Sequence, residues 1–583
     1  MASPPRARGA RLPRWTRDPV VWSASLAGGL LAVWALRAVL ADPLHTLWGQ
    51  SIDAVHAMWV VWWLPQDHSL PWVDHPYGSS GAILPPLGMA MAAQLGAFTT
   101  PAFAYSALCL GSIVLDLVML GILTARVSRS PRAAAVAPLL FLTARPVLAQ
   151  VAMGNPESVS VGWLCAGVWA GLAWSDRPFS HLSPAQTWVR EGAWSLGVGT
   201  LFAISVIENP YTLVPGLVAA LVLAARRLRR PRGVQATALA AVAGFVLIGW
   251  RLWAVGGRPG GTILPYDRLR WMGLEWQLYD TQTLYVQQLI WPGAMPELGA
   301  VQEAVATMGA HHFLGFTLMA LAAVSAGRRT RVWLVAAAVA ILLALGSAPL
   351  GNPGPPGLFV GLNQLLSAVI APITQPERFL VFAVLALSIC AGLGMVRLAR
   401  RLRPDLQTVA WLGLVGLVTA EALAWGGPAI AVPTLSTRPY ACLGELPDGA
   451  VYTYQDTRVP GLQSAGGMFL QTIHHQPGTH HGLSGWSETD DTLKLGKLVD
   501  KLHGSLLHHQ DARARNLHLR DLRCYGVQWA LVPSSKVWPA AEPVARACGD
   551  WVVVPLQDLS LSPCHATLSA DGTYRTVVGE VVE

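Results

Sequence analysis

The sequence has 583 residues, of which 53% are hydrophobic and only 13% are charged, whereas soluble domains carry about a quarter charged residues. This composition excludes an ordinary soluble protein and indicates that lipid is the main solvent of the chain. The net charge of +8 lies in short clusters between apolar runs, a pattern that sets orientation in a membrane and argues against a nucleic-acid partner.

Apolar runs of about 18–22 residues recur along the chain, and a run of this length can cross the hydrocarbon core as a helix. The first run follows five arginines and is longer than the apolar core of a signal peptide, and no clear A-x-A site follows it. We therefore expect a retained first span. The predicted spans are residues 20–40, 102–125, 133–152, 157–174, 191–207, 211–225, 234–254, 312–326, 332–347, 378–397 and 406–426, about eleven transmembrane helices in all.

The connections between these runs alternate in arginine content. The N-terminus and every second connection are rich in arginine, whereas residues 41–125 contain neither Lys nor Arg. Because positive residues stay on the cytoplasmic side, we expect a cytoplasmic N-terminus in a bacterial inner membrane. The large loops then lie on the outer side, at about 41–101, 255–311 and 348–377.

The composition changes from about residue 434, where short β-prone runs such as AVYTY, WALVP and WVVVP appear. A more helical stretch lies near 490–511. We predict a transmembrane domain at 1–432 and a periplasmic α/β or α+β domain at 433–583. In an oxidising compartment the cysteines of this domain could form up to two disulfides, with three possible pairings of Cys442, Cys524, Cys548 and Cys564.

The first outer loop carries the most informative acid. Asp53 and His56 are three residues apart, so a helix would place them on one face, with Trp59 and Trp63 near that face. An aspartate just outside the membrane, with no basic residue in its own loop, suits a general base or a metal ligand. The alternative is a solvated loop carboxylate. We expect the helix to lie on the outer leaflet with its aromatic rings at headgroup level.

Two further acids lie where outer turns are expected. Glu157 is in GNPES at 154–158, where Pro156 and Glu157 also fit the first turn of a helix. Glu208 is in ENPY at 208–211, which turn chemistry alone can explain.

Other polar groups leave more than one interpretation open. Asp116 lies inside a span and predicts either an ion pair, with Arg145 as its partner, or a substrate path. The segment HHQPGTHH at 474–481 could bind zinc or copper, although no thiolate or carboxylate pattern completes a site.

The layout resembles the GT-C superfamily, polytopic glycosyltransferases that use lipid-linked sugar donors. The similar features are a cytoplasmic start, one span, and a long outer loop with an early acid and surface helices. The segment QPERFLVFAVLALSICAGLG at 375–394 resembles the P-x-R-F … A-G-x-G span of a bacterial branch. MFLQTIHHQPGTHHG and LRCYGVQWALVP resemble segments of that branch's outer domain. Asp53 is followed by Ala54, so the adjacent acid pair of protein O-mannosyltransferase-like members is absent.

The resemblance implies hexosyl or pentosyl transfer from a polyprenyl-phosphate sugar to an extracytoplasmic glycan, lipid or protein. Asp53 and Glu157 match the catalytic acids, Asp53 as general base, and both could hold a divalent metal. Arg378 could bind the donor phosphate, because a guanidinium matches phosphate geometry, or it could pair with Glu377 or contact a lipid headgroup. The remaining candidate substrate-binding residues are His56, Trp59, Trp63 and Glu208.

Two other functions remain possible. A transporter or lipid flippase would use the many spans and Asp116, but it predicts internal repeats, and the sequence shows none. A non-catalytic envelope-assembly protein would use the outer domain to bind a partner. The sequence has no Walker A loop, no H-E-x-x-H and no nucleophile elbow, so nothing in it predicts ATP-driven transport.

Overall fold

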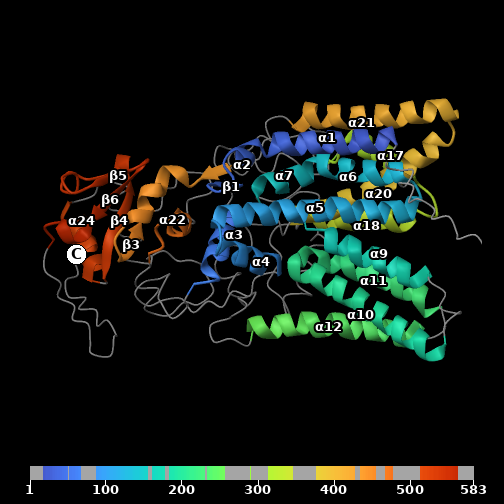
Figure 1. The fold of residues 1–583 in the computed structure, drawn as a ribbon, viewed down its shortest axis with the longest axis horizontal. Helices are drawn as coiled ribbons and strands as arrows, with labels where there is room; N and C mark the ends of the chain where they lie inside the picture. Colours follow the sequence, from blue (N-terminus) through green and yellow to red (C-terminus); the bar gives the residue numbers. More distant parts are fainter. Residues whose placement is uncertain are drawn as a thin grey trace, which may run out of the picture. The chain divides into compact units, whose positions relative to one another are not determined.

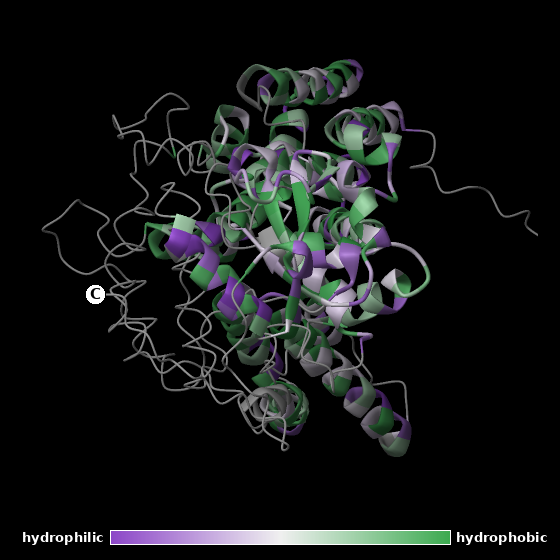
Figure 2. Ribbon diagram, turned by 90° about the vertical axis from the view of Figure 1, so that its left-hand side faces the viewer, coloured by the Kyte–Doolittle hydropathy of each residue, from purple (hydrophilic) through white to green (hydrophobic). Residues whose placement is uncertain are grey.

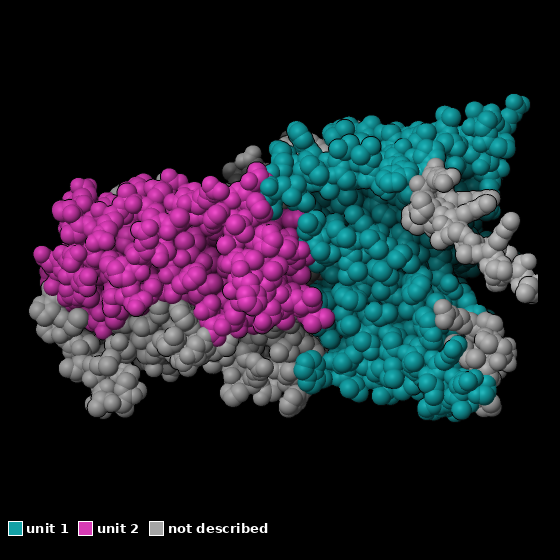
Figure 3. All heavy atoms as spheres, viewed as in Figure 1, with its two compact units in different colours: residues 1–40, 109–251, 266–432 teal, residues 41–108, 252–265, 433–583 magenta. Residues whose placement is uncertain are grey.

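The protein is described by a computed structural model, which forms two compact units (Figure 3). Unit 1 comprises residues 1–40, 109–251 and 266–432, and unit 2 comprises residues 41–108, 252–265 and 433–583. Unit 1 ends where the sequence predicts a domain boundary, but unit 2 also contains the first outer loop. The structure describes residues 18–49, 52–66, 87–154, 160–176, 183–229, 233–256, 289, 313–345, 376–426, 434–454, 466–476, 512–524 and 526–561.

Unit 1 is helical, and a helix lies at each predicted span (Figure 1). Among the described helices, four are long and apolar enough to cross a membrane, or five if the bent pair α6–α7 counts as one span. The total of eleven spans stays a prediction. The helices are α1 (Pro19–Ala35), α2 (Arg37–Ala41), α5 (Pro101–Ser128, shared with unit 2), α6 (Pro131–Thr143), α7 (Arg145–Met153), α9 (Gly162–Asp176), α10 (Pro184–Glu208), α11 (Leu213–Leu228), α12 (Gly233–Gly256), α17 (Phe316–Val324), α18 (Arg331–Ala344), α20 (Leu380–Ala399) and α21 (Pro404–Gly426), with short 3-10 turns η2 (Pro210–Thr212) and η3 (Pro376–Phe379).

Helix α20 is the core of unit 1, because 16 of its 20 residues are buried. Two glycines of the A-G-x-G motif permit its close packing. A Cβ at Gly394 would lie 2.1 Å from the carbonyl oxygen of Leu321 on α17, and one at Gly392 would lie 3.4 Å from Ala133 on α6. The motif therefore sets the distance between neighbouring helices.

The outer helices of unit 1 present apolar side chains to their surroundings. Trp22 on α1, Phe245 on α12 and Val409 on α21 are 64%, 75% and 63% exposed. Apolar residues, green in Figure 2, recur along the helices. Such large exposed apolar surface is expected of helices that face lipid.

The arginine-rich connections meet at one end of unit 1. Arg126 at the end of α5 binds Asp176 at the end of α9, with 2.9 Å between nitrogen and oxygen. Arg132 at the start of α6 binds Asp18, the residue before α1, at 2.8 Å. Arg397 near the end of α20 donates to backbone carbonyls just after α17. The arginine-rich connections that alternate along the sequence thus lie at the same end of the unit 1 helices.

A buried ion pair joins two helices of unit 1. Arg227 on α11 is 2% exposed and binds Glu191 on α10. Its guanidinium also lies 5.3 Å from the ring centroid of Trp174 on α9. Three helices therefore share one buried cation.

The C-terminal part of unit 2 contains a mixed sheet in the order β3-β4-β6-β5. Strand β3 is parallel to β4, and the other pairs are antiparallel. The three β-prone runs form β3, β4 and β6, which confirms a C-terminal sheet, while the predicted helical stretch 490–511 is outside the described residues. The elements are β3 (Ala450–Thr453), β4 (Val527–Pro533), β5 (Arg546–Cys548), β6 (Trp551–Pro555), α22 (Gly466–His474), α24 (Ala512–Cys524) and the short turns η5 (Arg438–Glu445), η6 (Ser534–Lys536) and η7 (Leu556–Asp558).

A disulfide links Cys442 in η5 to Cys548 in β5, with 5.8 Å between the Cα atoms. Cys524 is also disulfide-bonded, and Cys564 lies outside the described residues. The structure therefore selects one of the three pairings that the sequence leaves open.

The first outer loop folds with the C-terminal region. Strand β1 (Thr46–Trp48) pairs antiparallel with β2 (Thr434–Ser436). The carboxylate of Asp42 binds Arg438 beside this pair and accepts a hydrogen bond from His45 at 2.9 Å. The loop also supplies two helices, α3 (Ile52–Trp63) and α4 (Leu87–Gly96), as the sequence predicts.

Candidate functional site

Helix α3 carries the principal candidate acid. Asp53 is the second residue of the helix and His56 follows one turn later, so the predicted i, i+3 relation holds for the backbone. The side chains of both residues are outside the described part of the structure. The first turn of a helix favours a carboxylate, because the backbone N–H groups there are positive.

Buried contacts fix α3 within unit 2. Trp59 is 1% exposed, and its indole N–H donates to Oε1 of Gln471 on α22 at 2.8 Å. Its ring stacks on Trp63, with 5.6 Å between centroids and 17° between planes. Both tryptophans are buried, so their rings do not lie at headgroup level as the sequence predicts, and their contacts hold the helix. Their predicted role in substrate binding stays a prediction.

A hydrogen-bond network continues from Gln471 into the predicted histidine segment. Gln471 donates to the carbonyl of Gln476 at 3.0 Å, and the Gln476 side chain accepts from the N–H of Gly449 at 3.1 Å. His474 is 3% exposed, and its Nδ1 accepts from the N–H of Gln476 at 3.0 Å. His475 packs its ring 5.7 Å from that of Trp62 on α3. These two histidines therefore have structural contacts.

No group of three or more His, Cys, Asp or Glu side chains is placed to hold a metal ion within the described residues. The second histidine pair of HHQPGTHH, the acid Glu157 and the side chain of Asp53 lie outside that part. The predicted metal site on Asp53 and Glu157 therefore stays a prediction.

A second candidate region lies in unit 1 around Arg378. Arg378 in η3 is 7% exposed, and its guanidinium lies 5.4 Å from the ring centroid of Tyr211 in η2. Tyr211 makes an edge contact with Phe379, with 5.5 Å between ring centroids. The cation therefore lies against the aromatic ring of Tyr211, which suits a guanidinium because it is weakly hydrated.

Asn209 positions this region. Its side chain is fully buried, donates to the carbonyl of Ser160 at 3.3 Å and accepts from the N–H of Tyr211 at 3.0 Å. Sequence reasoning treats Asn209 only as part of an Asn-Pro turn. The neighbouring Glu208 ends α10 and is half-buried.

Glu157 itself is outside the described residues, but both ends of its segment are fixed. Gly154 ends α7 in the left-handed conformation, with φ of 69°, and hydrogen-bonds back to the last turn. Ser160 is bound by Asn209, as described above. Gly154 and Ser160, the described residues on either side of the Glu157 segment, therefore have defined positions in unit 1.

The predicted ion pair between Asp116 and Arg145 is wrong. Asp116 is 1% exposed, and its Oδ1 accepts the backbone N–H groups of Val161 and Gly162 at 2.9 and 2.6 Å. The start of α9 approaches α5 so closely that a Cβ at Gly162 would lie 2.8 Å from Leu115. The first N–H groups of a helix have no acceptor within the helix. At the start of α9 two of them donate to the Asp116 carboxylate, which takes the place of the predicted pair with Arg145.

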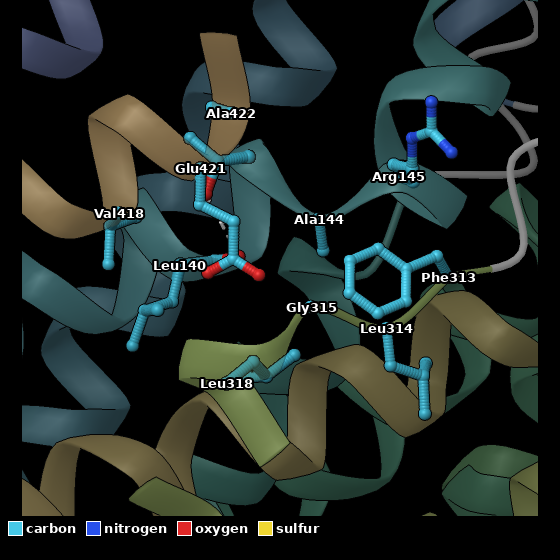
Figure 4. A pocket seen from close by; sticks show the side chains of 11 residues that line it. Leu140, Ala144, Arg145, Phe313, Leu314, Gly315, Leu318, Val418, Glu421 and Ala422 are labelled. Carbon is cyan, nitrogen blue, oxygen red and sulfur yellow. Dashed lines mark hydrogen bonds between the residues drawn. The ribbon is translucent and has the colours of Figure 1, made fainter. Parts of the chain in front are cut away.

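Arg145 instead lines a small cavity with Glu421 (Figure 4). The Glu421 carboxylate accepts the N–H groups of Phe316 and Thr317 at 2.6 and 3.2 Å and so caps α17. The cavity measures about 30 Å³, which is room for water but not for a sugar. This acid therefore has a structural role.

No protein-family model and no curated protein matches the chain. Among solved structures, the oligosaccharyltransferase of Archaeoglobus fulgidus tethered with an acceptor peptide is 12% identical, with a TM-score of 0.47, over 89% of this chain and 70% of that one. ArnT from Cupriavidus metallidurans bound to undecaprenyl phosphate is 14% identical, with a TM-score of 0.48, over 94% and 99%.

The arabinofuranosyltransferase AftD from mycobacteria is 13% identical, with a TM-score of 0.46, over 91% of this chain and 36% of that one. All three are glycosyltransferases of the GT-C superfamily.

Proposed function

We propose that the protein is a membrane glycosyltransferase that moves a hexosyl or pentosyl group from a polyprenyl-phosphate carrier to an extracytoplasmic acceptor. The observation that carries the proposal is the fixed position of α3, the helix that bears Asp53. Its buried Trp59–Gln471 hydrogen bond joins residues 412 positions apart. A catalytic acid needs such a rigid support, because small displacements of a reacting group cost much of its rate.

The proposed reaction is a displacement at the anomeric carbon. The Asp53 carboxylate takes the proton of the acceptor hydroxyl while the hydroxyl oxygen forms a bond to the anomeric carbon. The bond between the anomeric carbon and the phosphate oxygen breaks, and the polyprenyl phosphate leaves with the electron pair. Glu157 supports the acceptor during this step.

Arg378 is proposed to bind the donor phosphate. Its guanidinium is already buried against Tyr211, so phosphate binding requires little further loss of hydration from the cation. An ionic contact made away from bulk water is also stronger, because the local dielectric constant is low. The same charge stabilises the phosphate as it leaves.

A divalent cation held by Asp53 and Glu157 would neutralise charge on the phosphate when bound. The roles of Asp53 as base and Arg378 as phosphate ligand do not depend on it.

The test is sugar transfer by the purified full chain in proteoliposomes, supplied with tritium-labelled polyprenyl-phosphate hexoses and pentoses and an outer-envelope extract as acceptor. We expect Asp53→Asn to lower the rate by about 10²–10⁴-fold, the usual contribution of a general base, and Glu157→Gln to lower it less. Asp448→Asn, at an exposed turn of unit 2, is the matched control. Undiminished transfer by Asp53→Asn would reject its role, and no transfer by the wild type from any donor would reject the function.

The flippase alternative loses the residue that favoured it, since Asp116 is used to cap α9. A non-catalytic envelope-assembly protein remains the rival, and it predicts that no carrier-linked sugar is consumed.

A further inference from the structure

Unit 1 contains a cavity of about 420 Å³ that is lined by residues of α5, α9, α11, α18 and α20 and of the connection before α18. Most of its wall is made of aliphatic side chains from these helices, with the rings of Trp333 and Phe382. The volume is in the range of sites for small amphiphilic ligands. Because the helices are those predicted to span the membrane, the molecules that surround such a wall are lipids.

Charge is confined to one end of this cavity. Four arginines and one acid line it there, and Arg126 is paired with that acid, Asp176. Arg226, Arg328 and Arg329 make no salt bridge to any residue that the structure describes, and all three are exposed. The cavity therefore joins an apolar interior to a mouth with an excess of positive charge.

This end is the arginine-rich end of unit 1, which the positive-inside rule assigns to the cytoplasmic leaflet. Basic pockets between membrane helices on that side bind the headgroups of anionic lipids. We propose that the cavity is a binding site for one anionic phospholipid of the inner leaflet. Its phosphate contacts Arg226, Arg328 and Arg329, and part of an acyl chain enters the apolar wall.

Two arguments favour an anionic phospholipid: its charge complements the three arginines, and the site lies on the side assigned to the cytoplasmic leaflet. A zwitterionic phospholipid would bring a cation of its own to the three arginines. A polyprenyl phosphate would also supply a phosphate, but the proposed sugar transfer needs that carrier on the outer side. The lipid site shares no residue with the proposed catalytic site, and only the exclusion of polyprenyl phosphate rests on the proposed function.

Native mass spectrometry of the full chain in detergent tests the proposal, with phosphatidylglycerol, phosphatidylethanolamine of the same chains and undecaprenyl phosphate added in turn. We expect the wild type to retain phosphatidylglycerol preferentially. The triple variant Arg226→Ala, Arg328→Ala, Arg329→Ala should bind it on the order of a hundredfold more weakly, about fivefold for each lost charge near a membrane surface. Ala336→Trp, which fills the apolar wall, should also displace the lipid while leaving the arginines in place.

The matched control is Arg400→Ala with Arg401→Ala, two arginines at the same end of unit 1 that do not line the cavity. This double variant should retain phosphatidylglycerol as the wild type does. Each of three results would overturn the proposal: equal retention by the triple variant, equal binding of phosphatidylethanolamine, or displacement of phosphatidylglycerol by undecaprenyl phosphate at equal concentration. Thermal unfolding without added lipid confirms that each variant is folded.

Discussion

Replacing Gln471 by leucine should release α3 from α22. The substitution removes the acceptor of the Trp59 indole N–H, and Trp59 is only 1% exposed. A buried donor left without a partner costs about 1–3 kcal/mol. Gln471→Leu also removes the 3.0 Å hydrogen bond from the Gln471 side chain to the carbonyl of Gln476.

The size of the effect follows from the size of unit 2, which contains about 230 residues. For domains of 150–250 residues, about 1 kcal/mol shifts the melting temperature by 2–4 °C. A loss of about 2 kcal/mol should therefore lower the melting temperature of unit 2 by about 4–8 °C. In a Trp59→Phe background, which has no indole donor, Gln471→Leu should cost less, and the difference measures the coupling of the pair.

Hydrogen–deuterium exchange of the α3 amides is the direct assay, because it reports local opening of this helix. We expect faster exchange at residues 52–63 in Gln471→Leu and no change in Gln528→Leu, an exposed glutamine on β4. If α3 exchanges at the wild-type rate in Gln471→Leu, the buried hydrogen bond does not hold the helix. The support proposed for Asp53 would then be wrong.

Three further predictions concern packing and charge. Gly394→Ala should destabilise unit 1 by about 1–3 kcal/mol because its Cβ would meet a backbone carbonyl of α17, whereas Gly413→Ala, with open space around it, should not lower the melting temperature. Arg227→Met leaves a buried carboxylate on α10 without its cation and should cost about 3–5 kcal/mol in chemical denaturation. The hydrogen bonds from Arg438 and then His45 lower the pKa of Asp42 below its usual 3.8, so its stabilisation is present above that value and is lost as pH falls through the lower folded pKa. Asp42→Asn should therefore reduce the fall in melting temperature of unit 2 between pH 6 and pH 3, and an unchanged fall would show that this pair is not linked to folding.

The distribution of arginine predicts which helix ends of unit 1 lie on the same side, because charge at the ends of apolar runs is a local property of the sequence. Arg126, Arg132 and Arg397 lie at helix ends that meet on one side, as the alternation predicts. The β-prone runs of unit 2 were equally local signals, and three of them form strands.

Long-range pairing could not be predicted. Thr46 pairs with Ser436 and Trp59 with Gln471, and no periodicity in either segment indicates the other. The sequence therefore predicts that Trp59 lies at the membrane interface, whereas the structure buries it. The sequence predicts a side-chain partner for Asp116, because nothing near it indicates the two backbone donors at the start of α9. Those donors reach Asp116 only because Gly162, far away in the chain, permits the close approach of α9.

The roles proposed for both units require that residues 433–583 face the outside while the arginine-rich end of unit 1 faces the cytoplasm. Labelling of single introduced cysteines in intact cells with a membrane-impermeant thiol reagent measures this directly, since the native cysteines Cys109, Cys165 and Cys390 are buried. The account predicts that Asp448→Cys is labelled in intact cells and that Arg400→Cys is labelled only after permeabilisation. Labelling of Arg400→Cys in intact cells, with Asp448→Cys protected, would contradict the account and remove the basis for extracytoplasmic sugar transfer.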